Sequence, residues 1–481
     1  MKSKFAAFTL LLATVFLMAS CLESNDDYTY TDDCAISSFS VTTAKQNTFV
    51  KTKDGLRDSL VVKELSLSSY KFYIDQLNGK VYNPDSLPCG VDVKKLLCSV
   101  SNSSSGIVVI KSTTSDSLNY FNSTDSTDFS VDREVQVVSN SGLSVKKYTV
   151  HVNVHKEQAD SFAWHATPIC AELKNLQAIK TAAVNGKLLL LGTDGNATLV
   201  YSNDGTQWSK CETNLGHSLA ADAYKSVVVK DDYVYISDGG NIVRTNDGKT
   251  WNTMGEATGV TRLVAASRFS LYGYSADGRL MTSKDNGASW TVSEIDDELS
   301  LMPYGETTYA SVEIDGYAKT DRVMIFGTRD ASAYPNDKYL TIWGKIDEDS
   351  DNSENQPWAY YGVAADNKHA APLLSGISAV AYDDGVYMMG QVEGKAPKFY
   401  KSLDNGITWR EDTATVVLPT DFNENVTAAI TTKGTYALTV DKNKSLWLVN
   451  ARNGMTWRGR INRLGWAKEQ TSFEESYTLY I

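Results

Sequence analysis

Three pairs of neighbouring aspartates are the first candidates for acid–base chemistry in this sequence. They are Asp231-Asp232, Asp296-Asp297 and Asp383-Asp384. Two carboxyl groups on either side of a glycosidic bond are sufficient for glycoside hydrolysis. Adjacent strand residues, however, point to opposite faces of a sheet, and Asp383-Asp384 precedes Gly385, as is typical of a tight turn. We therefore interpret the pairs as turn residues and predict no catalytic residue among them.

Two histidines are candidates for metal ligation. His151 and His155 share one face of a predicted strand at residues 147–154, and the valines between them point to the other face. We favour a solvated polar face opposite a buried valine face over a metal site. The sequence has no Cys/His spacing typical of metal sites and no phosphate-binding loop in a supporting context. We therefore predict neither a metal nor a cofactor.

A turn motif recurs through the second half of the chain. The copies contain Ser202, Asp204 and Trp208; Thr245, Asp247 and Trp251; Ser283, Asp285, Gly287 and Trp290; and Ser402, Asp404, Gly406 and Trp409. A worn fifth copy keeps Gly454 and Trp457 but lacks the Ser and the Asp. Asp and Ser side chains can accept hydrogen bonds from the backbone of a tight turn, and Gly supplies a positive φ. We therefore assign these residues a structural role.

The motif resembles the Asp box, S-x-D-x-G-x-[ST]-W, of β-propellers. Residues 283–290 and 402–409 match this form in full, and the first two copies are one residue shorter. Trp208, Trp251 and Trp290 are spaced 43 and 39 residues apart, which is the length of a four-stranded propeller blade.

The long interval between the third and fourth copies is enough for two blades. Within it, Trp358 follows an acidic loop at residues 347–356 that takes the place of a box. The pattern predicts a six-bladed propeller with Trp457 in the fourth strand of the last blade. A strand around Trp164 either closes the ring or belongs to a seventh blade, which remains the alternative.

A separate domain is predicted before the propeller. Residues 34–158 contain short alternating segments separated by turn residues, which is typical of an all-β sandwich. The segments at 128–130, 135–138 and 147–152 resemble the closing strands of immunoglobulin-like modules. We therefore predict a sandwich at 34–158 and a propeller at 159–481, and we assign the sandwich a spacer or docking role.

The chain begins with a predicted export signal. Basic residues precede an apolar run that is too short to span a bilayer, and residues 1–20 end in Ala19-Ser20 before Cys21. The segment 18–21 resembles a lipobox, which implies that Cys21 is lipidated and starts the mature protein. Residues 21–33 are acidic and polar, as expected of a flexible tether. The tether resembles the export signal of surface lipoproteins, which implies an outer-membrane protein that faces the exterior.

Composition limits the classes of partner. The formal net charge is −12 and no basic cluster is present, which argues against nucleic acid. Five cysteines besides Cys21 remain, at positions 34, 89, 98, 170 and 211. Export permits a disulfide, with Cys89 and Cys98 as one option, but the sequence leaves the pairing open.

Asp-box propellers are best known from sialidases, so sialidase activity is the first function to test. Resemblance to a sialidase requires an arginine motif on the first blade that binds the substrate carboxylate in bidentate fashion. The sequence has no arginine between Arg133 and Arg244. We therefore do not expect a sialidase, and an enzyme of any kind is the less favoured class.

The long connections between strands are the candidate ligand-binding segments. Connections between the second and third strands of a blade face the propeller mouth, where ligands bind. These connections are tight in the first three predicted blades and long in the fourth and fifth. Connections from blade to blade face the mouth as well, and the one from the third to the fourth blade, about residues 293–308, is also long. The candidate residues are Tyr304 and Glu306 in this connection, and Arg329, Tyr334, Asn336, Glu393 and Lys395 in the fourth and fifth blades.

As a whole, the chain resembles a family of surface lipoproteins that pair an immunoglobulin-like domain with an Asp-box propeller. This resemblance implies a location and an architecture, and it suggests capture of an extracellular glycan or protein. Non-catalytic binding through the mouth is the favoured function. A divergent glycoside hydrolase or lyase and a scaffold in an outer-membrane assembly remain alternatives.

Overall fold

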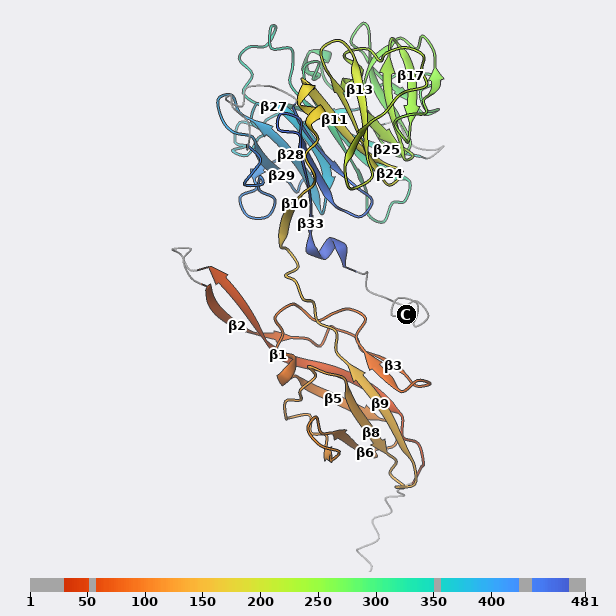
Figure 1. Cartoon of the computed structure of the whole chain (residues 1–481), viewed down its shortest axis with the longest axis vertical. Coiled ribbons are helices and arrows are strands. Elements are labelled where there is room, and N and C mark those ends of the chain that lie inside the picture. The colour runs from red at the N-terminus through yellow and green to blue at the C-terminus, as the bar shows by residue number, and fades with distance from the viewer. Residues whose placement is uncertain (1–29, 52–57, 350–355, 424–434, 467–481) are drawn as a thin grey trace, which may run out of the picture. The chain divides into compact units, whose positions relative to one another are not determined.

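The computed structural model describes residues 30–51, 58–349, 356–423 and 435–466 (Figure 1). They form two compact units, one within residues 30–158 and the other at 159–466. Strands dominate both units, and the helices of the described segments are short 3-10 turns, so the expected all-β class is confirmed. None of these helices is long and apolar enough to cross a membrane.

Several predicted segments lie outside the described residues. They are the export signal at 1–20, Cys21 and the tether up to residue 29, residues 350–355 of the acidic loop, and residues 467–481 of the second predicted domain.

In the described part of the first unit, two sheets surround one core. One sheet has the order β2-β1-β5, with bounds Asp58–Ser66, Ile36–Lys51 and Leu97–Asn102. The other has the order β3-β4-β9-β8-β6-β7, with bounds Tyr73–Asp75, Lys80–Tyr82, Val145–His151, Arg133–Val138, Ile107–Lys111 and Leu118–Tyr120. Phe39 of β1 lies in the same buried cluster as Val135 of β8 and Val150 of β9. The apolar faces of the two sheets therefore form one core.

Strand β9 follows the predicted alternation. Val150 is fully buried, and His151 on the opposite face is exposed. The imidazole of His151 bonds Asp132 at 2.5 Å and Asn153 at 3.0 Å. The exposed face thus carries a local hydrogen-bonded group.

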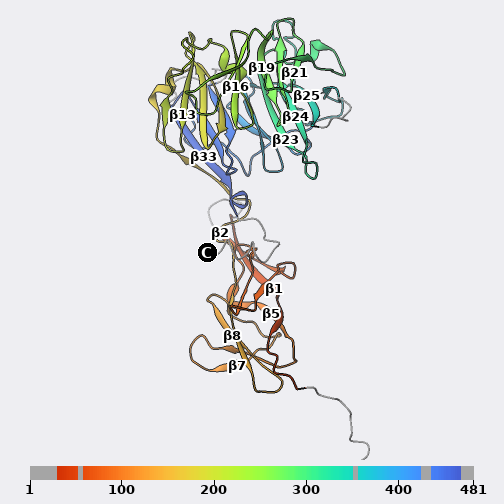
Figure 2. The same cartoon turned by 90° about the vertical axis from the view of Figure 1, so that its right-hand side faces the viewer.

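The second unit contains six four-stranded antiparallel sheets in its described residues, which follow one another around the unit (Figures 1 and 2). Five sheets are β11–β14 (Ala178–Val184, Lys187–Thr193, Thr198–Asn203, Trp208–Lys210), β15–β18 (Val228–Lys230, Tyr233–Asp238, Asn241–Thr245, Asn252–Gly255), β19–β22 (Val260–Ala266, Leu271–Ser275, Leu280–Ser283, Thr291–Val292), β23–β26 (Thr307–Glu313, Thr320–Gly327, Thr341–Glu348, Ala359–Tyr360) and β27–β30 (Ser375–Tyr382, Gly385–Gln391, Lys398–Ser402, Arg410–Glu411). Continuous apolar runs such as 188–191 are buried because each sheet packs between neighbours on both faces.

The sixth sheet joins the two ends of this unit. Its order is β31-β32-β33-β10, with bounds Tyr436–Val440, Leu446–Asn450, Met455–Ile461 and Phe162–Ala166. Strand β10, which contains Trp164, pairs along its whole length with β33 (Figure 1). The predicted position of Trp457 in a fourth strand is therefore wrong. Trp457 lies in the third strand, because the first strand of the unit supplies the fourth.

Four turns between third and fourth strands share one hydrogen-bond pattern. The hydroxyls of Ser283 and Ser402 accept from the N–H groups of Gly287 and Gly406, each at 2.8 Å. Asp285 then accepts from the N–H of Ser289 at 2.9 Å and from its hydroxyl at 2.5 Å. These bonds from Ser289 are the main reason that the pKa of Asp285 lies below its ordinary value. The side chains of the motif therefore hold the turn itself.

The first of these turns is shifted by one residue from the prediction. Asn203, not Ser202, accepts from the turn glycine, Gly205, at 2.7 Å. Asn203 pairs with Leu188 in the register in which Thr245 pairs with Val234. The Ser202 hydroxyl instead accepts from the thiol of Cys211 at 3.3 Å. The assignment of Ser202 to the turn is thus wrong, because an Asn carbonyl performs the task of the hydroxyl.

The tryptophan after each turn packs against the preceding sheet. Trp251 lies in one buried cluster with Leu189 and Val200 of the first sheet. Trp358 is fully buried with its ring 4.9 Å from that of Tyr272, so it takes the same place although its turn differs. These indoles therefore connect neighbouring sheets.

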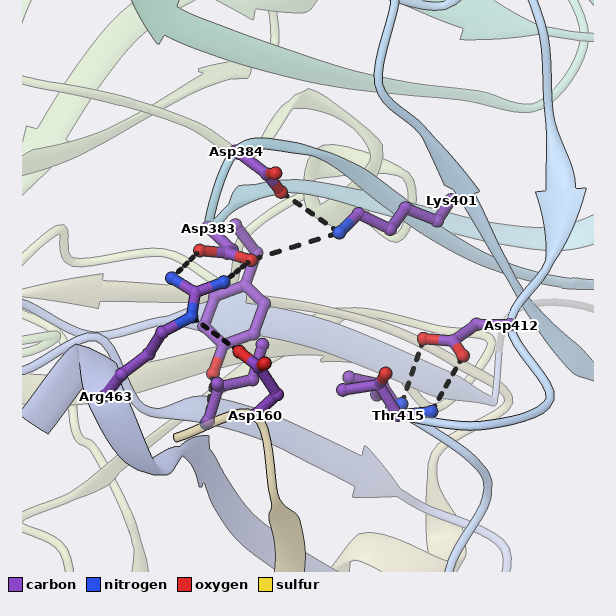
Figure 3. Close-up of polar contacts among 10 residues, drawn as sticks. Asp160, Asp383, Asp384, Lys401, Asp412, Thr415 and Arg463 are labelled. Carbon is purple, nitrogen blue, oxygen red and sulfur yellow. Dashed lines mark hydrogen bonds and ion pairs between the residues drawn. The ribbon is translucent and has the colours of Figure 1, made fainter. Parts of the chain in front are cut away.

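An arginine near the end of the second unit ties three segments together (Figure 3). Arg463, in the 3-10 helix η5 (Asn462–Gly465), donates two hydrogen bonds of 2.7 Å to Asp383 and one of 2.8 Å to Asp160. Asp383 lies in the tight turn between β27 and β28 with a positive φ of 56°, as its pair was predicted to do. Its carboxylate is 6% exposed and lies 3.9 Å from the ammonium of Lys401. The hydrogen bonds that Arg463 donates to Asp383 and Asp160 raise the pKa of Arg463.

We expect Arg463→Met to lower the free energy of unfolding of the second unit by about 2 kcal/mol. The substitution keeps a long side chain but removes the bidentate partner of a buried carboxylate, and hydrogen bonds to charged groups contribute about 1.5–3 kcal/mol. Calorimetric unfolding of the purified protein measures this loss. Arg410→Met, which changes the same charge on the exposed strand β30, is the control and should leave the transition unchanged. Equal unfolding temperatures for both variants would show that the contact between Arg463 and Asp383 does not stabilise the second unit.

Candidate binding cavity

A cavity of about 930 Å³ opens where the first strands of the sheets begin. Its wall includes the starts of β11 and β27, the start of β31 and the connections 328–337 and 391–394. These segments come from different sheets, and only closure of the unit brings them together. Its volume is within the range of about 300–1,000 Å³ typical of ligand sites. We call it the central cavity.

Five of the seven predicted ligand-binding residues line the central cavity. They are Tyr304, Glu306, Arg329, Tyr334 and Glu393. The other two, Asn336 and Lys395, lie in the same connections, but their exposed side chains are not part of the described cavity wall. The structure thus gathers most of this set in one place.

One wall of the central cavity carries a preassembled group of three side chains. Arg329 donates to Asp337 through Nε at 2.8 Å and Nη2 at 2.5 Å, and its guanidinium lies 3.6 Å from the centre of the Tyr334 ring. The hydrogen bond to Asp337 is the main reason that the pKa of Arg329 is raised. Because cation and carboxylate are matched, the group offers a rigid aromatic and polar surface.

Glu306 has a structural role that its position in a loop did not predict. Its carboxylate accepts from the N–H groups of Gly376 and Ile377 at 2.9 and 2.8 Å. The register of β27 against β28 shifts between Ser375 and Ser378, so this segment departs from the regular ladder. Glu306 supplies the acceptor that these N–H groups need, and it thereby joins two neighbouring sheets at the cavity.

Tyr304 is likewise fixed in place. Its hydroxyl donates to the carbonyl of Gly278 at 2.6 Å, and its ring lies 5.0 Å from that of Tyr274. Only part of the side chain faces the cavity, since it is half-buried. Burial is the main reason that the pKa of Tyr304 is raised.

Two cationic side chains of the cavity wall, Lys180 and Arg262, were missed by sequence reasoning. We call this part of the wall the floor of the cavity. Lys180 of β11 donates to the carbonyl of Thr307 at 2.8 Å. Arg262 of β19 donates to the carbonyls of Gly305 and Tyr304 at 3.0 and 3.2 Å. Burial lowers the pKa of Lys180 to about 8; the charge of Glu306 opposes this shift and that of Arg262 adds to it. A basic residue in a first strand was the only signal available.

The paired aspartates do not contribute to the described wall of the central cavity. Asp231 and Asp232 have positive φ values of 51° and 60° in the turn between β15 and β16. Asp296 lies in a longer connection and accepts from the N–H of Tyr360 at 2.9 Å. These contacts are structural.

Known structures similar to this chain have low sequence identity to it. YCF48 from Cyanidioschyzon merolae is 16% identical, covers 62% of this chain and 98% of its own, and gives a TM-score of 0.30. BamB from Moraxella catarrhalis is 11% identical, with 69% and 94% covered and a TM-score of 0.29. A carbohydrate-active enzyme of family AA12 from Trichoderma reesei is 13% identical, with 63% and 96% covered and a TM-score of 0.38. The comparison with curated proteins found no match.

Family models match both units. Residues 39–152 match the N-terminal domain of the DUF6242 family, a domain of unknown function. Residues 158–469 match the DUF6242 beta propeller domain. The predicted β-propeller is thereby confirmed as the fold of the second unit. Since this match alone spans more than half of the sequence, the chain belongs to the DUF6242 family.

Proposed function

We propose that this protein captures an extracellular glycan or protein through the central cavity without chemically changing it. The cavity itself carries this proposal: it is large, its aromatic and polar groups are fixed by contacts within the protein, and it lies at a junction of several sheets. Preorganised groups bind a ligand at a lower entropic cost than mobile ones.

The same proposal covers the finer architecture. Each of the six sheets is one blade of a six-bladed propeller, and the four turns with the shared hydrogen-bond pattern are Asp boxes. The first unit is an immunoglobulin-like spacer. Cys21 is lipidated and holds the protein in the outer membrane, facing the exterior, so that the cavity meets extracellular ligands. The sequence of residues 1–33 and the two-sheet core of the first unit support these assignments.

Hydrolysis is not the favoured chemistry. Glycosidases need a carboxylic acid and a second carboxylate on either side of the bond. Within the described cavity wall, Glu306 is engaged by two backbone N–H groups and Asp337 by Arg329. Asp330 and Glu393 are exposed at the rim, and hydrogen bonds from the backbone N–H and hydroxyl of Ser332 lower the pKa of Asp330, which favours its ionised form over that of a general acid.

A glycan-array and hydrolysis screen tests the proposal on soluble protein that starts near Asp26. We expect saturable binding without product release, and Tyr334→Ala should weaken it at least about tenfold, because buried aromatic anchors contribute about 2 kcal/mol or more. Tyr317→Ala is the matched control, since Tyr317 is 66% exposed in the turn between β23 and β24 of the same sheet. Product release from any sugar would contradict the proposal.

A further inference from the structure

The floor of the central cavity carries two neighbouring, partly buried basic groups. Lys180 comes from the first strand of one sheet and Arg262 from the first strand of another. Their described hydrogen-bond acceptors are backbone carbonyls: Thr307 for Lys180, and residues 303–305 for Arg262. Carbonyl oxygens solvate a cation but do not neutralise its charge. The cations of the floor are therefore hydrogen-bonded to uncharged groups, and the opposite charges that act on them are those of Glu306 on Lys180 and Asp222 on Arg262.

The acidic groups of the described wall do not cancel this charge. The charge of Glu306 acts on Lys180, and the two backbone N–H groups that donate to its oxygens leave that charge unchanged. Asp337 forms an ion pair with Arg329, and the exposed rim acids Asp330 and Glu393 are screened by solvent. Lys180, Arg262 and the exposed Lys225, which also lines the cavity, stand against Glu306 and against Asp222, whose charge acts on Arg262. One positive charge is therefore in excess at the floor, in a chain whose formal net charge is −12.

We propose that the floor of the central cavity binds the carboxylate of an acidic saccharide, with Lys180 and Arg262 as its cationic partners. This inference rests on the proposed function and names the ligand class. An ammonium has three N–H donors, and Lys180 uses one for the Thr307 carbonyl. Above the floor, the walls present the polar side chains of Ser375, Ser378 and Thr328. Such groups suit the hydroxyls of a sugar ring.

Binding should depend on pH through Lys180. The charged groups that act on it are Glu306 and Arg262. The cavity wall also carries the half-buried Tyr224 and the buried Tyr436, and burial raises the pKa values of both. Burial lowers the pKa of Lys180 to about 8, so its ammonium loses its proton as the pH rises through that value. A bound carboxylate favours the protonated form. Affinity should therefore be highest below pH 8 and should fall above it.

Titration calorimetry of the soluble protein with tetragalacturonate tests the inference. We expect binding at pH 7 that is weakened at least about tenfold by Lys180→Met, because the variant loses a charge-assisted hydrogen bond to the carboxylate. Lys210→Met removes the same charge from the exposed outer strand β14 of the same sheet and should bind as the wild type does. The methyl ester of the sugar, which lacks the charge, should bind at least about tenfold more weakly than the acid. These wild-type comparisons with the ester and between pH 7 and pH 9.5 hold even if the Lys180 variant does not fold.

Other outcomes overturn the inference in distinguishable ways. Equal affinity for acid and ester, or displacement of the sugar by an acidic peptide with higher affinity, would reject the acidic saccharide. Binding of neutral glycans or proteins that Tyr334→Ala weakens, without binding of the acid, would leave the proposed function intact and reject this inference alone. No binding of any glycan or protein would reject both.

Discussion

Trp409→Ala is expected to lower the free energy of unfolding of the propeller by about 3–5 kcal/mol, the typical cost of removing a buried aromatic side chain. Trp409 is 3% exposed and lies in a cluster with Met324, Phe326 and Ile342 of the preceding sheet. Its ring meets that of Phe326 edge to face at 5.4 Å. Truncation would leave a cavity between two sheets that neither can close alone, since each is held by its other neighbour.

Trp290 separates the contribution of burial from that of the turn. Both indoles donate to the glycine carbonyl of their own turn, at 2.9 Å for Trp409 and 3.1 Å for Trp290. Trp290, however, is only half-buried. Trp290→Ala should therefore cost about 1–2 kcal/mol, since less apolar area returns to water. Denaturant unfolding of the two variants compares them directly. A similar loss in both would mean that the indole hydrogen bond, and not packing between sheets, determines stability.

The turn motif predicted the propeller because its chemistry is local. Ser283, Asp285 and Gly287 act on one another within a few residues, so their spacing alone reveals the turn. The same reasoning failed at Ser202, because the Asn side chain next to it can accept the same hydrogen bond and the motif does not include Asn at this position. Only the pairing of Asn203 with Leu188 on the neighbouring strand decides between them.

Closure of the ring and the cavity floor were not accessible to local reasoning. Trp457 was placed in a fourth strand because it ends the last turn copy, but β10 from the start of the unit fills that position. Lys180 and Arg262 come from the first strands of two different sheets, and neither lies in a sequence motif. Tyr304, Arg329 and Tyr334 could be predicted because long loops face the mouth, whereas the floor depends on which first strands meet at the centre.

Glu306 was predicted as a ligand residue, and its contacts assign it a second role with a large effect on stability. Gly376 has a positive φ of 63°, which turns two successive N–H groups out of the irregular ladder of β27 and toward one point. The Glu306 carboxylate accepts both. Such a concave backbone arrangement favours an anion. Without it, the N–H groups of two buried residues lose their acceptor.

We therefore expect Glu306→Ala to lower the free energy of unfolding by about 3 kcal/mol, because each unsatisfied buried donor costs about 1–3 kcal/mol. Glu306→Gln keeps one acceptor oxygen and should cost about half as much. Glu393→Ala removes the same charge from the exposed rim of the central cavity and should leave thermal and denaturant unfolding unchanged. A stable Glu306→Ala variant that has lost ligand binding would contradict the structural role. It would support the ligand-binding role that the loop position of Glu306 predicted. A loss of stability in Glu306→Ala with an intermediate loss in Glu306→Gln would instead show that the carboxylate holds the backbone of the cavity wall in place. The floor beside it would then be positioned by the fold before any ligand binds.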